Sequence, residues 1–237
     1  MSPFRAEWVV LDIEGTTSAT EAIVGDLYRY ARPRLGPYIT GHPEDPEVVQ
    51  AVEEVRRLAG LPGPDVEEVV EALEGWMDAD QKVTPLKTLQ GLIWAHGFAA
   101  GELTSQFFDD VPPALRRWHD AGLHLAVFSS GSVASQQAWF RHSPAGDLLA
   151  LVTATFDTAN AGPKRESASY DAITHSLESP PERTLFLSDV PAELDAAATV
   201  GWLTVGVRRP GEPNADADFG SHLTVRSFDE LAVAKGD

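Results

Sequence analysis

The sequence predicts an α/β fold, in which a Rossmann-like parallel sheet carries helices on both faces and a helical cap domain is inserted after the first strand. Three observations lead to this prediction. Residues 9–11 form a continuous apolar run that ends in a carboxylate, which is typical of a parallel strand buried on both faces. From about residue 104 onward, strand and helix patterns alternate as in consecutive βα units. Between residues 19 and 103, apolar residues instead recur at helical spacing.

The inserted segment, residues 19–103, is therefore predicted to be the helical cap, and residues 1–18 and 104–237 the α/β core. Within the predicted cap, the clearest helical patterns cover 46–59, 65–80 and 86–99. Stretches rich in proline and glycine separate the helices and are predicted to be loops: 36–37, 41–43 and 60–64.

The elements expected in the α/β core follow from buried apolar runs and from helix stop residues such as Gly122 and Gly201. Strands are expected at 123–128, 149–156, 184–187 and 203–207. Helices are expected at 111–121, 133–142, 166–177 and 192–199. The tail after Pro210 is predicted to be a loop that leads to a last short strand and helix.

Length and composition indicate a globular protein. The chain has 237 residues, 43% of them hydrophobic, which is enough for a substantial core. No apolar run approaches the about 20 residues of a membrane helix, and the N-terminus lacks the pattern of a secretory signal, so a cytoplasmic protein is expected. Without cysteine, any metal must be held by oxygen or imidazole, and five of the histidines lack the spacing of metal ligands: His96, His119, His124, His142 and His175.

The net charge of −18 argues against nucleic acid or an anionic membrane as a partner, because both require a basic surface. An anionic small molecule would instead need local positive charge from a bound cation and a well-placed lysine. No apolar stripe indicates a protein partner, so a monomer is expected.

Carboxylates follow two of the predicted strands. Asp12 and Glu14 follow the first, and Asp189 follows 184–187, with Glu193 four residues later. Ligands of open α/β sheets bind at the carboxyl ends of the strands, and carboxylate oxygens with a backbone carbonyl and water suit Mg²⁺. The alternatives are solvated surface acids and, for Asp189, an N-cap of the next helix.

Two further segments carry groups suited to phosphate. Ser129 and Ser130 lie between a predicted strand and a helix, where hydroxyls and free backbone N–H groups can bind a phosphate; an ordinary N-cap is the alternative. Lys164 lies in a loop before a helix and could neutralise charge during phosphoryl transfer, although a single loop lysine is usually solvated.

The order of these motifs resembles the haloacid-dehalogenase-like hydrolase superfamily. More narrowly, the chain is similar to the enolase-phosphatase, or acireductone synthase, family of methionine salvage, over nearly its whole length. This resemblance rests on the segments LDIEGTT (11–17), LKTLQGLIW (86–94), FFDDV (107–111), SSGSV (129–133), FDT (156–158) and KRESASY (164–170). The Glu at the second acidic position of the first motif separates this family from the wider superfamily, which generally carries Asp there.

The resemblance implies an Mg²⁺-dependent bifunctional enzyme that enolises 2,3-diketo-5-methylthiopentyl 1-phosphate and then dephosphorylates it to an acireductone. By position, Asp12, Glu14 and Asp189 would hold one Mg²⁺ per subunit, Glu14 through its backbone carbonyl. Ser129, Ser130 and Lys164 would bind the substrate. Asp12 would be the nucleophile and Glu14 the acid and base.

Two alternative functions are also compatible with these residues. A phosphatase of the same superfamily acting on another small phosphate ester would share the core and differ in the cap. A non-catalytic sensor of a phosphorylated metabolite would bind without turnover, although it would not need the nucleophile.

Overall fold

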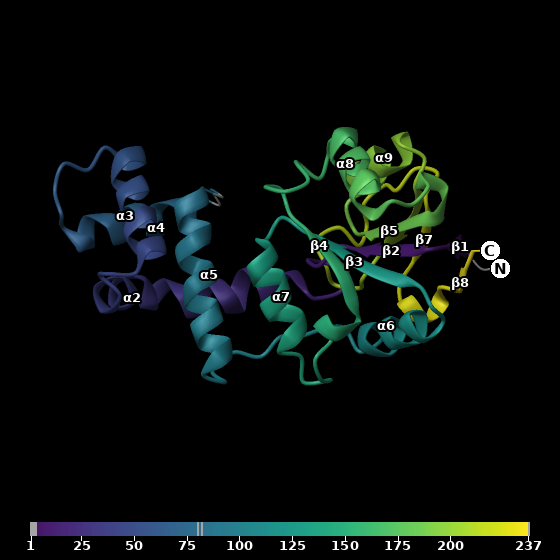
Figure 1. The fold of residues 1–237 in the computed structure, drawn as a ribbon, viewed down its shortest axis with the longest axis horizontal. Helices are drawn as coiled ribbons and strands as arrows, with labels where there is room; N and C mark the ends of the chain where they lie inside the picture. The colour runs from purple at the N-terminus through teal and green to yellow at the C-terminus, as the bar shows by residue number, and fades with distance from the viewer. Residues whose placement is uncertain (1–3, 80, 82, 237) are drawn as a thin grey trace. The chain divides into compact units, whose positions relative to one another are not determined.

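The computed structural model describes residues 4–79, 81 and 83–236, and the chain divides into two compact units (Figure 1). The α/β unit comprises Met1–Ile23 and Thr104–Asp237, and the helical unit comprises Val24–Leu103. The first division therefore lies a few residues later than the predicted position after residue 18. That the helical unit acts as a cap stays a prediction.

The α/β unit is built on a sheet of six parallel strands in the order β4-β3-β2-β5-β6-β7. The strands are β2 (Trp8–Leu11), β3 (His124–Phe128), β4 (Val152–Phe156), β5 (Thr184–Ser188), β6 (Leu203–Val207) and β7 (Leu223–Val225). In the middle of the sheet, Leu11 of β2 pairs with Val127 of β3 and Leu187 of β5. The predicted α/β class with a parallel sheet is confirmed.

Helices cover both faces of this sheet (Figure 1). On one side lie α6 (Val111–Asp120) and α7 (Val133–Arg141), and on the other α8 (Ser167–Leu177) and α9 (Pro191–Thr199). Each begins and ends within two residues of its predicted position, because the apolar period and the stop residues that mark these helices are local.

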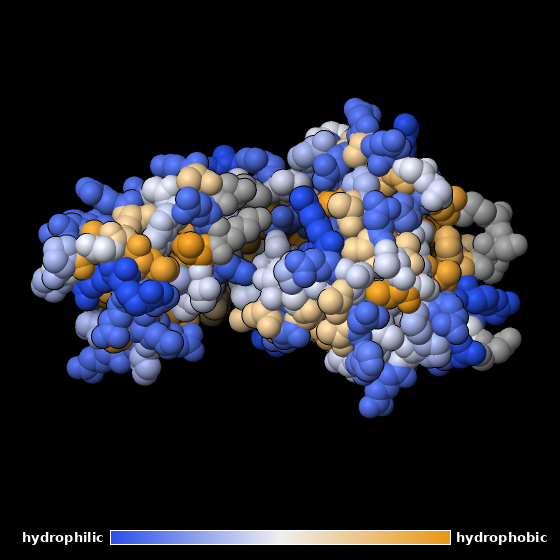
Figure 2. All heavy atoms as spheres, turned by 90° about the horizontal axis from the view of Figure 1, so that it is seen from above, coloured by the Kyte–Doolittle hydropathy of each residue, from blue (hydrophilic) through white to orange (hydrophobic). Residues whose placement is uncertain are grey.

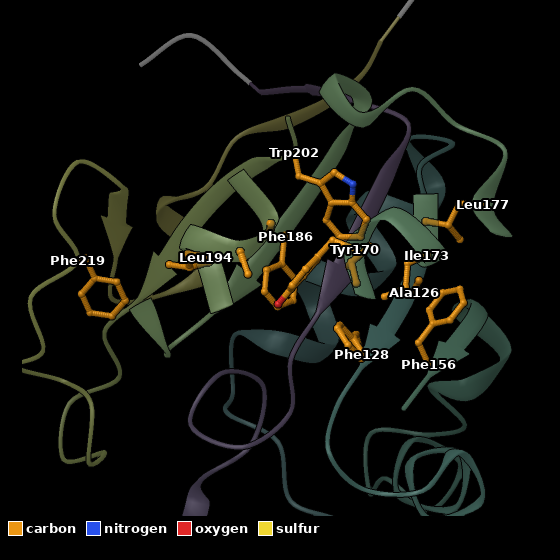
Figure 3. Close-up of a cluster of buried hydrophobic side chains, with 13 residues drawn as sticks. Ala126, Phe128, Phe156, Tyr170, Ile173, Leu177, Phe186, Leu194, Trp202 and Phe219 are labelled. Atoms are coloured by element: carbon orange, nitrogen blue, oxygen red, sulfur yellow. The ribbon is translucent and has the colours of Figure 1, made fainter. Parts of the chain in front are cut away.

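The core between the sheet and α8 is aromatic (Figure 3). The ring of Tyr170 in α8 packs edge-on against Phe128 of β3, Phe186 of β5 and Trp202, with centroid separations of 5.6, 5.4 and 5.3 Å. Such edge-to-face contacts add to the free energy gained by burial. The Tyr170 hydroxyl donates to the backbone carbonyl of Lys164 at 2.7 Å, so this core also fixes the loop that carries the lysine.

Two predictions for the α/β unit need correction. The predicted strand 149–156 starts as a 3₁₀ turn, Leu149–Leu151, before β4, and the predicted last helix is only a 3₁₀ turn, Phe228–Glu230. A strand not predicted from the sequence, β1 (Phe4–Ala6), pairs with β8 (Val233–Lys235) in a separate two-stranded parallel sheet. Each of these strands has three residues and depends on a partner at the other end of the chain, which local patterns do not report.

The helical unit contains the three predicted helices, observed as α3 (Pro46–Ala59), α4 (Val66–Asp78) and α5 (Thr84–Ala99). Asp80, the last residue of the second predicted helix, lies outside the described residues. The segment before them is also helical: it comprises a π-helical segment (Glu21–Leu27), α1 (Tyr28–Ala31), a 3₁₀ turn (Arg32–Arg34) and α2 (Leu35–Gly41).

The loop predicted at residues 36–37 is wrong, because Gly36 and Pro37 lie in the first turn of α2. A proline is tolerated there, since the N–H groups of the first turn have no partner within the helix. The loop at 60–64 is present, and Gly60 ends α3 in the left-handed region with φ of 68°.

Hydrophilic residues cover most of the face seen in Figure 2, and hydrophobic residues form small separate areas on it. This agrees with the strongly negative net charge. Within the part of the chain that the structure describes, no helix has the length and apolar character needed to cross a membrane.

Candidate active site

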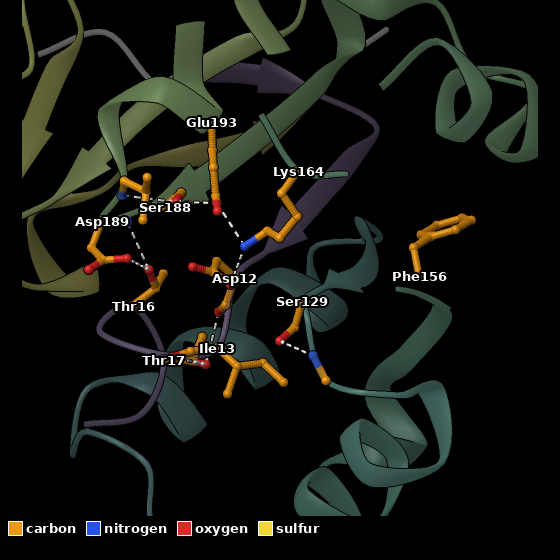
Figure 4. A network of polar contacts seen from close by, with 12 residues as sticks. Asp12, Ile13, Thr16, Thr17, Ser129, Phe156, Lys164, Ser188, Asp189 and Glu193 are labelled. Carbon is orange, nitrogen blue, oxygen red and sulfur yellow. Dashed lines mark hydrogen bonds and ion pairs between the residues drawn. The ribbon is translucent and has the colours of Figure 1, made fainter. Parts of the chain in front are cut away.

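Three of the predicted site residues directly follow adjacent strands. Asp12 follows β2, Ser129 follows β3 and Asp189 follows β5. Because β2 lies between β3 and β5, these side chains come together at the carboxyl edge of the sheet (Figure 4). All three residues are at most 4% exposed, so they form a buried polar group rather than a solvated acidic surface.

The turn after β2 is tight and brings the chain against Asp189. The carbonyl of Ile13 accepts the backbone N–H groups of Thr16, Thr17 and Ser18 at 3.2, 3.0 and 2.9 Å. Gly15 has φ of +70°, and a Cβ atom at this position would lie 2.4 Å from Asp189 Oδ2. Only glycine meets both the dihedral and the space requirement here.

Lys164 lies at the centre of the site (Figure 4). Its Nζ is 2.6 Å from Asp12 Oδ1 and 2.7 Å from Glu193 Oε2, and the three side chains are less than 10% exposed. Glu193 also accepts a hydrogen bond from Ser188 Oγ at 2.9 Å. A loop lysine that could have been solvated is therefore a buried cation held between two carboxylates.

Electrostatics fix the protonation of this lysine. Burial disfavours the ammonium, but the charges of Asp12 and Glu193 and their hydrogen bonds outweigh burial and raise the pKa of Lys164 above its usual value. Burial raises the pKa of Glu193 to about 7, and the charge of Lys164 opposes that shift. At neutral pH Lys164 is thus a permanent cation in contact with Asp12.

Asp189 is held by hydrogen bonds to both of its carboxylate oxygens. Thr16 Oγ1 lies 3.4 Å from Oδ1, and Asn214 Nδ2 donates to Oδ2 at 2.8 Å. Burial and the nearby charge of Asp12 raise the pKa of Asp189 to about 6. The alternative of an N-cap does not describe this residue, because the N-cap position of α9 belongs to Val190 and has no side-chain cap.

The loop after β3 is organised by its own side chains. Ser129 Oγ accepts the N–H of Gly131 at 3.3 Å, and Gln136 Nε2 donates to the carbonyls of Gly131 and Phe156, both at 2.8 Å. The N-cap of α7 is Ser132, whose hydroxyl accepts the N–H of Ser135, and not Ser129 or Ser130.

Ser130 and Glu14 complete the predicted set. Ser130 is half-buried next to Ser129. Glu14 is also half-buried, two residues beyond Asp12, and its backbone pairs with that of Ser18. The structure therefore pairs Lys164 with Asp12 and places Asp189 at the end of the neighbouring strand, with its own partners Thr16 and Asn214. Ser130 and Glu14 lie in the adjoining turns.

The donor set fits Mg²⁺. Asp12 and Asp189 are buried carboxylates, the backbone approaches Asp189 closely at Gly15, and Glu193 adds a third carboxylate, which is paired with Lys164. Hard oxygen ligands with excess negative charge favour a hard divalent cation. Among the described residues, no three His, Cys, Asp or Glu side chains form a ready metal cluster, so backbone and water oxygens would have to complete the coordination.

Three contacts in this candidate site were not predicted. The contact of Glu193 with Lys164 could have been suspected from its position one helical turn after Asp189, on the side of α9 nearest the strand end. The contacts of Asp189 with Thr16 and Asn214 could not have been predicted in this way. They join residues 173 and 25 positions apart, and no local pattern indicates them.

Comparisons with known proteins agree with this geometry. The family model of the haloacid dehalogenase-like hydrolases matches residues 6–201. A protein of Saccharopolyspora erythraea named Enolase-phosphatase E1 is 61% identical over 230 residues, 96% of each chain, and one of that name from Streptomyces avermitilis is 56% identical over 99% of this chain and 98% of its own.

Among solved structures, the UTR4 protein of Saccharomyces cerevisiae superposes with a TM-score of 0.82 at 27% identity, over 96% of this chain and 100% of its own. The family resemblance predicted from the sequence is therefore confirmed. The chain belongs to the haloacid dehalogenase-like hydrolases and, among them, to the enolase-phosphatases.

Proposed function

We propose that the chain converts 2,3-diketo-5-methylthiopentyl 1-phosphate, through its enol phosphate, to the acireductone 1,2-dihydroxy-3-keto-5-methylthiopentene and phosphate, as a step of methionine salvage that uses one Mg²⁺ per subunit. The observation that carries the proposal is the buried carboxylate of Asp12, 2.6 Å from the permanent cation Lys164 at a strand end. The name of its bacterial relatives supports the combination of enolase and phosphatase activities.

In the phosphatase reaction, Asp12 attacks phosphorus, and the bond between phosphorus and the ester oxygen breaks. The product is an aspartyl-phosphate, which water hydrolyses in a second step. Glu14 donates a proton to the leaving oxygen and then takes one from the water. Lys164 stabilises the charge on the transferring group, and the hydroxyls of Ser129 and Ser130 donate to its oxygens.

Asp12, the backbone carbonyl of Glu14 and Asp189 would hold Mg²⁺, which when bound supplies positive charge opposite the phosphate. Lys164 contributes a second positive charge in contact with Asp12, and Glu193 holds the lysine ammonium in place. The contact with the Lys164 ammonium thereby holds the Asp12 carboxylate in one orientation, as a nucleophile requires.

In the enolase reaction, a base removes a proton from the carbon next to a carbonyl group. The carboxylates beside Lys164 raise its pKa and favour the ammonium, which is not a base. It can instead donate a hydrogen bond to the oxygen on which negative charge develops. We assign the base to Glu14, which lies in the same turn as Asp12.

The test is to give the purified protein the diketo phosphate with and without Mg²⁺, while ultraviolet absorbance of the enol products and free phosphate are followed together. Both products are expected only with Mg²⁺. Asp12→Asn is expected to lower phosphate release at least about a thousandfold, because the amide is not a nucleophile. Phosphate release retained by this variant would exclude the covalent route.

The other outcomes separate the remaining functions. Release of phosphate from other esters, with no reaction of the diketone, would indicate a phosphatase of different specificity. Binding of the diketone without either product would indicate a sensor.

A further inference from the structure

The loop that follows β6, residues 208–220, reaches the site from a distant part of the chain. It brings Asn214 to Asp189, where the amide Nδ2 donates to Oδ2 at 2.8 Å. On the other oxygen, Thr16 Oγ1 lies 3.4 Å from Oδ1, and the same hydroxyl accepts the backbone N–H of Asp189 at 2.9 Å. The two donors together fix the plane of the carboxylate.

The loop has its own supports, which are independent of Asn214. The guanidinium of Arg208 donates to the carbonyls of Ala215 and Ala217 at 3.1 and 3.0 Å and lies 4.7 Å from the centroid of the Phe219 ring. Glu212 Oε2 accepts the backbone N–H of Thr20 at 2.9 Å. Removing the amide of Asn214 should therefore leave the loop in place.

The start of the same loop holds the second donor. Arg209, 3% exposed, donates from Nε to the carbonyl of Thr16 at 2.9 Å and from Nη1 to Asp110, and it lies between the rings of Phe108 and Phe228. One segment thus supports the Asp189 carboxylate twice, directly through Asn214 and indirectly through Thr16.

We infer that Asn214 is a positioning residue that orients the carboxylate of Asp189 for Mg²⁺, and that the loop 208–220 is a functional part of the active site. This inference rests on the proposed function. A carboxylate with one oxygen held by an amide donor keeps a lone pair directed at the cation, and loss of such an outer contact typically weakens metal binding 10- to 100-fold. Because Asn214 is half-buried, the lower end of this range is expected.

The test is a calorimetric titration of the metal-free protein with Mg²⁺. Asn214→Ala is expected to raise the Kd for Mg²⁺ about tenfold, with kcat restored at saturating Mg²⁺ to within about threefold and the midpoint of thermal unfolding nearly unchanged. Asp216→Ala, a truncation at an exposed position of the same loop, is the matched control and should leave the Kd within about twofold, since an exposed charge is screened.

A second variant, Arg208→Met, loosens the loop away from the site and should raise the Kd by a smaller factor than Asn214→Ala. If Asn214→Ala binds Mg²⁺ as tightly as the wild type, the positioning role is excluded while the proposed function stands. If the wild type itself binds no Mg²⁺, the proposed function fails and the role of Asn214 fails with it.

Discussion

The two units of this protein differ in the burial of their most deeply placed ion pairs. In the α/β unit, Lys164, Asp12 and Glu193 form an ion-pair group whose side chains are 5–9% exposed. In the helical unit, the ion pair between Arg32 and Asp78 has side chains that are 38% and 69% exposed. Exposed pairs contribute little to stability, whereas buried charges carry a large desolvation cost that their partners only partly offset.

This difference indicates where the molecule is adapted to chemistry. Apolar side chains would stabilise the strand ends of the sheet at least as well as buried ions do. In the helical unit, aliphatic residues such as Val55, Leu73 and Leu89 are buried in the core, and the ion pair of Arg32 with Asp78 lies at the surface. The presence of several buried carboxylates around one lysine is therefore best explained by the reaction proposed for them.

The largest expected effect is at Lys164. Lys164→Met leaves Asp12 and Glu193 buried without their cation, and the free energy of unfolding should fall by about 3–5 kcal/mol in metal-free buffer. Urea denaturation measures this loss. Lys235→Met, at an exposed lysine, is the control and should change stability little. If Lys164→Met is as stable as the wild type, the buried ion pairs of the α/β unit matter no more for stability than the exposed pairs of the helical unit.

A smaller, pH-dependent effect is expected at Asp110, which binds Arg209 through two oxygens. Burial alone would raise the pKa of Asp110, but hydrogen bonds from Arg209 and the N–H of Phe228 outweigh it and lower the pKa below its usual value. The stabilisation is therefore complete above the unfolded-state pKa, about 4, and is lost as the pH falls through the lower folded-state pKa.

Asp110→Asn should accordingly cost about 2 kcal/mol at pH 7, and the difference from the wild type should shrink below about pH 4. Denaturant unfolding at a series of pH values tests this, with the exposed neighbour in Asp109→Asn as the control. A difference that does not change with pH would mean that the ionised carboxylate is not what stabilises the fold.

The smallest effect is expected in the helical unit. Asp78→Ala removes the pair with Arg32, and the free energy of unfolding should change by less than about 0.5 kcal/mol, because both side chains are solvated. Thermal unfolding of both proteins at low and high salt measures this difference in stability. A loss comparable to that of Lys164→Met would contradict the distinction drawn between buried and exposed pairs.

Much of the fold followed from local patterns. The helix α3 has its predicted bounds, and β6 coincides with the strand predicted at 203–207. Periodicity and stop residues act within a few positions of the chain, so the sequence alone reports them. The same approach failed where the pattern is short or ambiguous, as at Gly36 and Pro37, which begin a helix, and at β1, which exists only because β8 pairs with it.

The fold class could be predicted from the amino-acid sequence, and so could the residues that follow the ends of the strands. These residues include Asp12, Ser129 and Asp189, which share one edge of the sheet because parallel strands all end on that edge. The position of Lys164 between Asp12 and Glu193, and the contact of Asn214 with Asp189, depend on how the chain packs in three dimensions. These contacts join residues far apart in the chain, and their distances are set by packing of the loops against the sheet, which no local pattern encodes.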